Sequence, residues 1–377
     1  MNSRRNCSAG CALILTLALA SFGCERARPQ LNGTHIKNIE LLAKLSKRCV
    51  GRYEIALPGK FSLNTEGRQI IDGVDVTITE ATHSAFVDAL SGRTAKLESS
   101  YTLGIDQKYP MLKKIIPLPG GGRGVVFDRA ESEVSGGRLS RILELMAWKD
   151  GYTIVASIKA TDTSFPEDKD DEIVRQHLKT DIPKKLARLV DVFSRSRGRS
   201  DTETPDQQGI CVLNGFVSGP PSTQEKVTVF YHLVDAPDVY FRISTNSSGA
   251  SADTVVDRMK NIEPLLAGGE GKVIRKGSRD TNGMRASEIA YSVLSDEDLE
   301  KRRILTHFFT FEANAQQGNA QNPILTVDLV NGERKPEPER VSHPPAPALE
   351  KATLTAKEVS ALWDAVIPTI QRSATAF

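Results

Sequence analysis

The sequence lacks the motifs of the common catalytic sites. It contains no Gly-x-Ser-x-Gly nucleophile elbow, no His-Glu-x-x-His zinc motif and no Cys-x-x-Cys pair. Its six histidines are scattered without the spacing of metal ligands. We therefore expect a protein that is not an enzyme and that needs no cofactor and no metal.

The sequence also has almost no net charge and no long block of one sign. Its 49 basic and 47 acidic residues give +2. Arg4 and Arg5 lie in a segment that we expect to be removed, which leaves 2 − 2 = 0 for the mature chain. A neutral chain argues against nucleic acid as a partner. The composition is that of an ordinary soluble protein, and 377 residues suggest about two domains.

The N-terminal apolar run, from Ala12 to Ala20, is too short to span a bilayer. It follows Arg4 and Arg5, a pattern typical of an export signal. We therefore predict a signal peptide over residues 1–23 and a mature protein in the periplasm.

Two cleavage sites fit this leader. Ser21-Phe22-Gly23-Cys24 resembles a bacterial lipoprotein box, in which the cysteine carries the lipid, and ordinary cleavage after Ala20 is the alternative. We favour lipidation of Cys24, because a lone thiol beside the cut would otherwise be exposed in an oxidising compartment.

Cysteine is scarce, with five residues in all. Cys7 and Cys11 lie in the predicted signal and Cys24 would be the anchor, which leaves Cys49 and Cys211. These two could pair, or each could be a small buried apolar residue.

A weak internal repeat helps to choose between these alternatives. Cys-Val opens an apolar run at Cys49 and at Cys211, and Arg-Ile-Leu opens a longer run at Arg141 and at Arg303. The spacings agree, because 141 − 49 = 92 and 303 − 211 = 92. Chance and an internal duplication both remain open as explanations. A duplication would place the two cysteines in separate cores, and we therefore predict that both are reduced.

The same order of elements is expected in both halves: a strand, a helix, two strands and a closing helix. Strands are expected at 74–78, 141–148 and 152–160 in the first half, and at 227–234, 303–313 and 324–330 in the second. Ser84 and Ser251 are the expected helix caps.

Three local signals are sharper. Asp150-Gly151 predicts a hairpin turn between two strands. Thr355 and Glu358 predict a capping box at the start of the last helix, which Pro368 should kink or end.

These elements predict an α+β protein of two similar domains, each an antiparallel sheet with helices packed on one face. We place an N-terminal segment at 24–46, the first domain at 47–195 and the second at 209–377. Residues 196–208 are predicted to be a polar linker without burial, because 194–208 contains no large apolar residue. Each domain should therefore fold alone. The proline-rich stretch 333–347 is expected to be a stiff connector.

Three patterns that could form a site have simpler interpretations. The glycine cluster at 119–124 runs into an expected strand, so it is interpreted as a turn and not as a phosphate loop. His232 and His307 lie in expected strands and are interpreted as structural rather than as a catalytic pair. The acidic run 167–172 is interpreted as a solvated helix start. The carboxylates that could assist the histidines are Asp328 and Glu312.

Two stretches resemble a known family. Residues 49–58 read Cys-Val-Gly-Arg-Tyr-Glu-Ile-Ala-Leu-Pro and follow an expected leader, and residues 209–217 read Gly-Ile-Cys-Val-Leu-Asn-Gly-Phe-Val. Together they resemble the immunity proteins that protect bacteria from type VI secretion phospholipase effectors. The similarity spans nearly the whole mature chain.

The resemblance implies a two-domain periplasmic binder that grips its cognate secreted lipase effector, blocks the lid and active site, and catalyses nothing. It implies no particular contact residue. The alternative function is an envelope lipoprotein with a structural or assembly role, and an unrecognised hydrolase is a more distant third. A neighbouring gene with a lipase elbow would favour the immunity protein.

Overall fold

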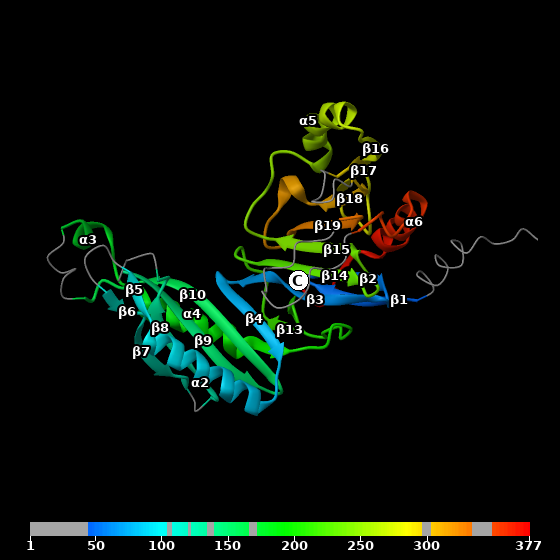
Figure 1. The fold of residues 1–377 in the computed structure, drawn as a ribbon. Helices are drawn as coiled ribbons and strands as arrows, with labels where there is room; N and C mark the ends of the chain where they lie inside the picture. Colours follow the sequence, from blue (N-terminus) through cyan, green and yellow to red (C-terminus); the bar gives the residue numbers. More distant parts are fainter. Residues whose placement is uncertain are drawn as a thin grey trace, which may run out of the picture.

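The structure has two lobes that meet near the centre of the view in Figure 1. It is a computed structural model that describes residues 44–103, 108–119, 122–133, 139–165, 172–295, 303–333 and 349–377. The predicted signal peptide, Cys24 and nearly all of the predicted connector 333–347 lie outside these residues.

The first half of the chain forms most of one lobe, which we call the first lobe. Its elements are β1 (Leu45–Val50), β2 (Tyr53–Pro58), β3 (Phe61–Ile71), β4 (Val74–Glu80), α2 (His83–Ser99), β5 (Tyr101–Leu103), β6 (Lys108–Pro110), β7 (Leu112–Pro117), β8 (Gly124–Ala130), β9 (Ser140–Lys149), β10 (Tyr152–Thr161), α3 (Glu172–His177), α4 (Ile182–Arg195) and β11 (Ser196–Gly198).

The second half of the chain repeats much of this order of elements and forms most of the other lobe, which we call the second lobe. Its elements are β12 (Gly209–Val212), β13 (Gly215–Ser218), β14 (Lys226–Leu233), β15 (Ala236–Asn246), α5 (Val255–Gly268), β16 (Lys272–Ser278), β17 (Ala286–Leu294), β18 (Leu305–Ala313), η3 (Ala315–Gln317), β19 (Ile324–Asn331), α6 (Ala356–Val366), η4 (Ile367–Thr369) and β20 (Gln371–Arg372).

One antiparallel sheet of 12 strands runs through both lobes, in the order β16-β17-β18-β19-β15-β14-β3-β4-β10-β9-β8-β7. Its two halves meet where β3 pairs with β14 over most of its length. The prediction of a separate sheet for each domain is therefore wrong, because β3 pairs across the centre and with β4 only near their shared turn.

Read outward from this centre, the two halves of the sheet have the same strand order. The first half runs β3-β4-β10-β9-β8-β7 and the second runs β14-β15-β19-β18-β17-β16. The Arg-Ile-Leu repeat lies at the start of β9 and just before β18, which hold matching places in this order.

Helices cover both faces of the sheet, so the prediction of helices on one face is wrong. Along β9, Leu143 and Leu145 belong to the core that includes α4, whereas Met146 and Trp148 pack in the cluster under α2. Successive side chains of a strand point to opposite faces. β9 is therefore apolar on both sides and is covered by a helix on each.

The local predictions from the sequence are largely confirmed. All six expected strands are present within a few residues. Asp150 and Gly151 form the turn between β9 and β10 with positive φ angles of 49° and 87°, as a two-residue hairpin requires. The helix caps are Thr82 and Thr254, not Ser84 and Ser251.

The capping box of the last helix is also confirmed. Thr355 accepts a hydrogen bond from the backbone of Glu358, whose carboxylate accepts one from the backbone N–H of Thr355 at 2.7 Å. The α-helix ends at Val366, two residues before Pro368, as predicted. The helix seats Trp363 against Phe309 at 5.5 Å between ring centroids.

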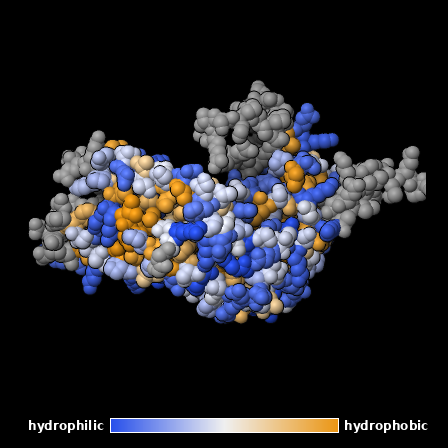
Figure 2. Space-filling model, turned by 90° about the horizontal axis from the view of Figure 1, so that it is seen from below, coloured by the Kyte–Doolittle hydropathy of each residue, from blue (hydrophilic) through white to orange (hydrophobic). Residues whose placement is uncertain are grey.

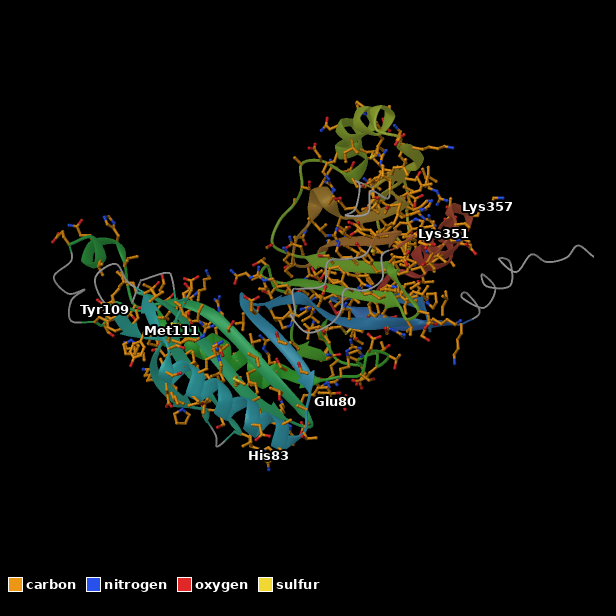
Figure 3. All side chains as sticks on the ribbon, in the orientation of Figure 1. Glu80, His83, Tyr109, Met111, Lys351 and Lys357 are labelled. Carbon is orange, nitrogen blue, oxygen red and sulfur yellow. A yellow bond between two sulfur atoms is a disulfide. The ribbon has the colours of Figure 1, made fainter. Side chains whose placement is uncertain are left out.

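Thr355→Ala is expected to lower the free energy of unfolding by about 1 kcal/mol, because the backbone N–H of Glu358 loses its acceptor and the Glu358 carboxylate loses the Thr355 hydroxyl. Urea unfolding followed by circular dichroism measures the change. Lys357→Ala is the control, since Lys357 is exposed on the same helix and labelled in Figure 3. An equal loss in both variants would contradict the role of the cap.

Candidate functional site

The joint between the lobes is built from two exchanged hairpins. The β1–β2 hairpin of the first half packs on α6, and the β12–β13 hairpin of the second half lies against α4. The strand after each closing helix completes the exchange, because β20 pairs with β2 and β11 pairs with β13. Each lobe therefore contains a piece of the other half.

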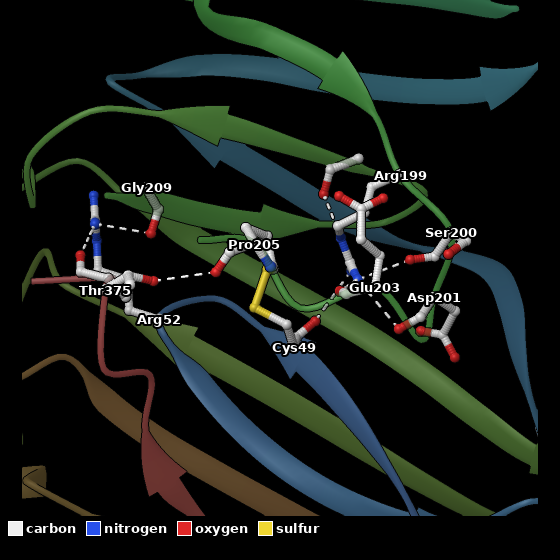
Figure 4. The surroundings of a disulfide bond; sticks show 12 residues. Cys49, Arg52, Arg199, Ser200, Asp201, Glu203, Pro205, Gly209 and Thr375 are labelled. Atoms are coloured by element: carbon white, nitrogen blue, oxygen red, sulfur yellow. Dashed lines mark hydrogen bonds between the residues drawn. A yellow bond between two sulfur atoms is a disulfide. The ribbon is translucent and has the colours of Figure 1, made fainter. Parts of the chain in front are cut away.

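A disulfide between Cys49 and Cys211 links the two hairpins (Figure 4). Their Cα atoms lie 5.7 Å apart, and beside them Gly51 and Cys211 exchange backbone hydrogen bonds of 2.9 and 2.8 Å. The prediction that both cysteines are reduced is wrong. The repeat places them at matching positions, but the exchange of hairpins brings those positions together at the centre.

A buried arginine holds the joint on one side of the disulfide. Arg52 is 1% exposed and Glu225 is 3% exposed, and the guanidinium donates to the two carboxylate oxygens at 2.9 and 2.6 Å. Arg52 also donates to the carbonyls of Gly209, Pro220 and Ala376. One side chain thus connects the first hairpin, the second hairpin and the C-terminal segment.

The predicted linker 196–208 is part of the joint. Its first residues form β11, and Arg199 is 3% exposed. The Arg199 guanidinium donates to the carbonyl of Cys49 at 3.3 Å and to that of Glu203 at 2.6 Å, and burial lowers its pKa. The expectation of a linker without burial is wrong, because the segment's own carbonyls satisfy an enclosed arginine (Figure 4).

Tyr231, a buried residue of β14, also contacts this segment. The hydroxyl of Tyr231 donates to Asp201 at 2.6 Å. Burial, together with the nearby carboxylate, raises the pKa of Tyr231 well above its usual value. Tyr231 therefore stays a neutral donor and connects the segment to β14.

The two strand histidines are not brought together. His232 on β14 and His307 on β18 are separated by β15 and β19. His307 lies 3.1 Å from the Asn331 amide, and burial lowers its pKa. His232 stacks on Tyr240 at 5.2 Å. The carboxylates have other partners: Asp328 accepts from Arg242 and Thr310, and Glu312 pairs with Arg258.

The other two patterns show no site in the described part of the chain. The glycine cluster leads into β8 at Gly124, where an added Cβ would lie 2.3 Å from the Met146 carbonyl oxygen. Of the acidic run, only Glu172 is described, as the first residue of α3. The described residues contain no cluster of His, Cys, Asp and Glu that could hold a metal and no helix suited to cross a membrane.

Between α2 and α5, the central strands leave one face of the sheet uncovered by any described helix. We call it the open face. Along β4, Val76 and Ile78 are buried while Thr77 and Thr79 are exposed on this face. The exposed ion pair between Arg68 and Asp75 lies beside them, at 2.9 Å. The open face is therefore polar on the first lobe.

On the second lobe the open face contains an aromatic recess of about 350 Å³. Phe230 and Tyr240 form a cluster with Phe308 and Val330. Tyr291 stacks on Phe308 at 5.2 Å between ring centroids. The half-exposed Arg242, paired with Asp328 at 2.8 Å, stands at the rim. This recess could hold an apolar side chain beside a charge.

Hydrophobic side chains also gather on the first lobe, at the left of the view in Figure 2. Exposed apolar residues of this half include Val87, Tyr101, Leu103 and Ile115. A groove of about 540 Å³ lined by Pro119, Pro183, Leu186 and Val190 follows α4. Such surfaces are common at protein interfaces.

Two family models match the chain, one for each half. The N-terminal domain of Tle cognate immunity protein 4 matches residues 46–199, and its C-terminal domain matches residues 203–373. The chain belongs to this family. The resemblance to type VI secretion lipase immunity proteins is thereby confirmed, and the two models meet within the predicted linker 196–208.

Solved structures of immunity proteins share the fold of this family member. The apo structure of the type VI secretion immunity protein TplEi from Pseudomonas aeruginosa is 17% identical over 88% of this chain and 98% of its own, with a TM-score of 0.62. The crystal structure of a Tle4–Tli4 complex matches at 17% identity over 89% and 99%, with a TM-score of 0.63. No curated protein sequence matches significantly.

A further structure shows a related immunity protein with a ligand. TplEi complexed with an "L" peptide is 16% identical over 87% of this chain and 98% of its own, with a TM-score of 0.58. At such identities the likeness establishes the fold alone.

Proposed function

We propose that this protein binds and neutralises a cognate type VI secretion lipase effector by gripping it with both lobes. The observation that carries the proposal is the match of both halves to the two domains of the immunity family. The related Tle4–Tli4 complex supports an effector as the partner. The protein acts by binding and catalyses nothing.

The open face is the surface that we assign to the effector. It is continuous across the β3–β14 pair, so that one partner can touch both lobes at once. Polar residues such as Thr77 line it on the first lobe, and the aromatic recess lies on the second. A partner that covers both buries more than the roughly 1,600 Å² of a standard interface.

The periplasm is the proposed location, with Cys24 as a lipid anchor. The Cys49–Cys211 disulfide supports export, because disulfides form and persist in oxidising compartments. The lipoprotein-like Ser-Phe-Gly-Cys sequence supports the anchor. An internal duplication is part of the same proposal, and the matching strand orders of the two halves support it.

The test is binding to an inactive form of the lipase encoded beside this gene, measured by calorimetry. Thr77→Arg on the first lobe and Arg242→Glu on the second should each weaken binding about tenfold or more, because each adds bulk or the wrong charge to the interface. Lys357→Glu, on the outer side of α6, is the control. If only one lobe's variant weakens binding, the two-lobed grip is wrong; if the wild type does not bind, the function is wrong.

A further inference from the structure

Within the sheet, the two lobes are joined by only two pairs of residues between β3 and β4. Strand β3 belongs to the second lobe through its pairing with β14, and it meets β4 of the first lobe only at Ile70 and Ile71. The turn that follows, Asp72-Gly73, has positive φ angles of 53° and 78°. Few ladder bonds flank this turn, and its other contacts include the hydrogen bond from Gly73 to the Gln224 carbonyl at 3.3 Å and the Asp72–Arg195 ion pair at 2.5 Å, so we take it as the hinge.

The exchanged hairpins connect the lobes a second time. Within the described residues, the Cys49–Cys211 bond is the only covalent cross-link between the hairpins besides the main chain itself. It joins positions 162 residues apart. Both cysteines are buried, at 5% and 1% exposure, and they pack with Phe216. The bond therefore lies inside the joint, where a change in sulfur separation moves both hairpins.

Without the bond, only non-covalent ties remain between the first hairpin and the second hairpin with the segment before it. They are the two backbone hydrogen bonds between Gly51 and Cys211, the 3.0 Å hydrogen bond from Arg52 to the Gly209 carbonyl, and, from the segment before β12, the 3.3 Å hydrogen bond from Arg199 to the Cys49 carbonyl and the Arg48–Asp201 ion pair. Formation of the bond from two thiols passes two electrons and two protons to a disulfide oxidant, which becomes a dithiol, and reduction by a dithiol is the reverse exchange. Two thiols need van der Waals separation, which pushes against those ties.

We propose that the Cys49–Cys211 disulfide is a redox-dependent brace that fixes the angle between the lobes, so that the protein grips its effector only after the bond has formed. The binding step rests on the proposed function. In the reduced protein the lobes swing about the β3–β4 turn, and only a fraction of molecules has the angle that fits. Apparent affinity falls in proportion to that fraction.

The experiment measures the distance between the lobes in the full mature chain. Spin labels are attached through non-natural amino acids at the exposed positions Ser91 on α2 and Asn261 on α5, so that no new thiol is introduced. Double electron–electron resonance compares the oxidised protein, the protein reduced with dithiothreitol, and the Cys49→Ala/Cys211→Ala variant. We expect a narrow distribution when oxidised and one at least twice as wide in the other two.

Affinity for the inactive effector should fall about tenfold or more in the variant, whose distances and affinity should no longer respond to dithiothreitol. If the variant does not fold, the reduced wild type, with both thiols counted by labelling, takes its place. Equal widths with and without the bond overturn the brace. A wider distribution without any loss of affinity overturns its link to gripping. An oxidised wild type that binds no effector overturns the proposed function, while the distance measurement still decides on the brace.

Discussion

Replacing Arg52 with methionine is expected to lower the free energy of unfolding by about 3–5 kcal/mol, because the carboxylate of Glu225 stays buried without its partner. The backbone carbonyls that Arg52 binds, including that of Ala376 near the C-terminus, lose their donor as well. Chemical unfolding at neutral pH measures the loss.

Arg68→Met is the matched control for this variant. Arg68 also pairs with a carboxylate, that of Asp75, but the two side chains are 65% and 47% exposed, so that less than about 1 kcal/mol should be lost. Combining Arg52→Met with Glu225→Gln should recover part of the stability, because the unpaired charge is removed. Similar losses in Arg52→Met and Arg68→Met would show that the joint does not depend on burial of this pair.

The local structure could be predicted from the sequence because it depends on nearby residues. Alternating Val74, Val76 and Ile78 fixed the period of β4, and the Asp150-Gly151 turn adopts the positive φ angles that its residues favour. The expected cap of α2, Ser84, lies two residues after the observed cap, Thr82. Threonine and serine are both good caps, and the local sequence does not show at which of the two the helix begins.

The joint could not be predicted because its partners lie far apart in the sequence. Arg52 stands in the stretch that carries the family resemblance, but Glu225 lies 173 residues away and its neighbourhood carries no signal. Arg199 lies in a stretch without large apolar residues, where burial arises from backbone carbonyls instead. A hydrophobic pattern cannot reveal a core that is held by an enclosed guanidinium.

The repeat led to a sound comparison and a wrong conclusion. It correctly matched the strands that Cys49 and Cys211 occupy, since β1 and β12 each open a hairpin. The two cysteines would lie in separate cores only if each hairpin packed against the other elements of its own half of the chain. Because the hairpins are exchanged, the cysteines meet, and the same exchange argues against the expectation that each domain folds alone.

Residues 44–206 and 207–377, expressed separately, are therefore expected not to fold. In the first fragment, β1–β2 has lost α6 and β3 has lost β14; in the second, β14 has lost β3 and β13 has lost β11. Each fragment exposes apolar surface that the other covers. Neither should show a cooperative unfolding transition by circular dichroism, and neither should protect cells from the effector.

The matched control is the same cut made after folding. A protease site inserted between Asp206 and Gln207, which are both exposed, allows the intact chain to fold before it is cleaved. The nicked protein should keep its cooperative transition and its binding, because the exchanged hairpins, the Arg52–Glu225 pair and the disulfide still hold the halves together. A cooperative transition in either separate fragment would show that the hairpin exchange is not needed for folding. Separation of the nicked halves without reductant would show that the Cys49–Cys211 disulfide has not formed.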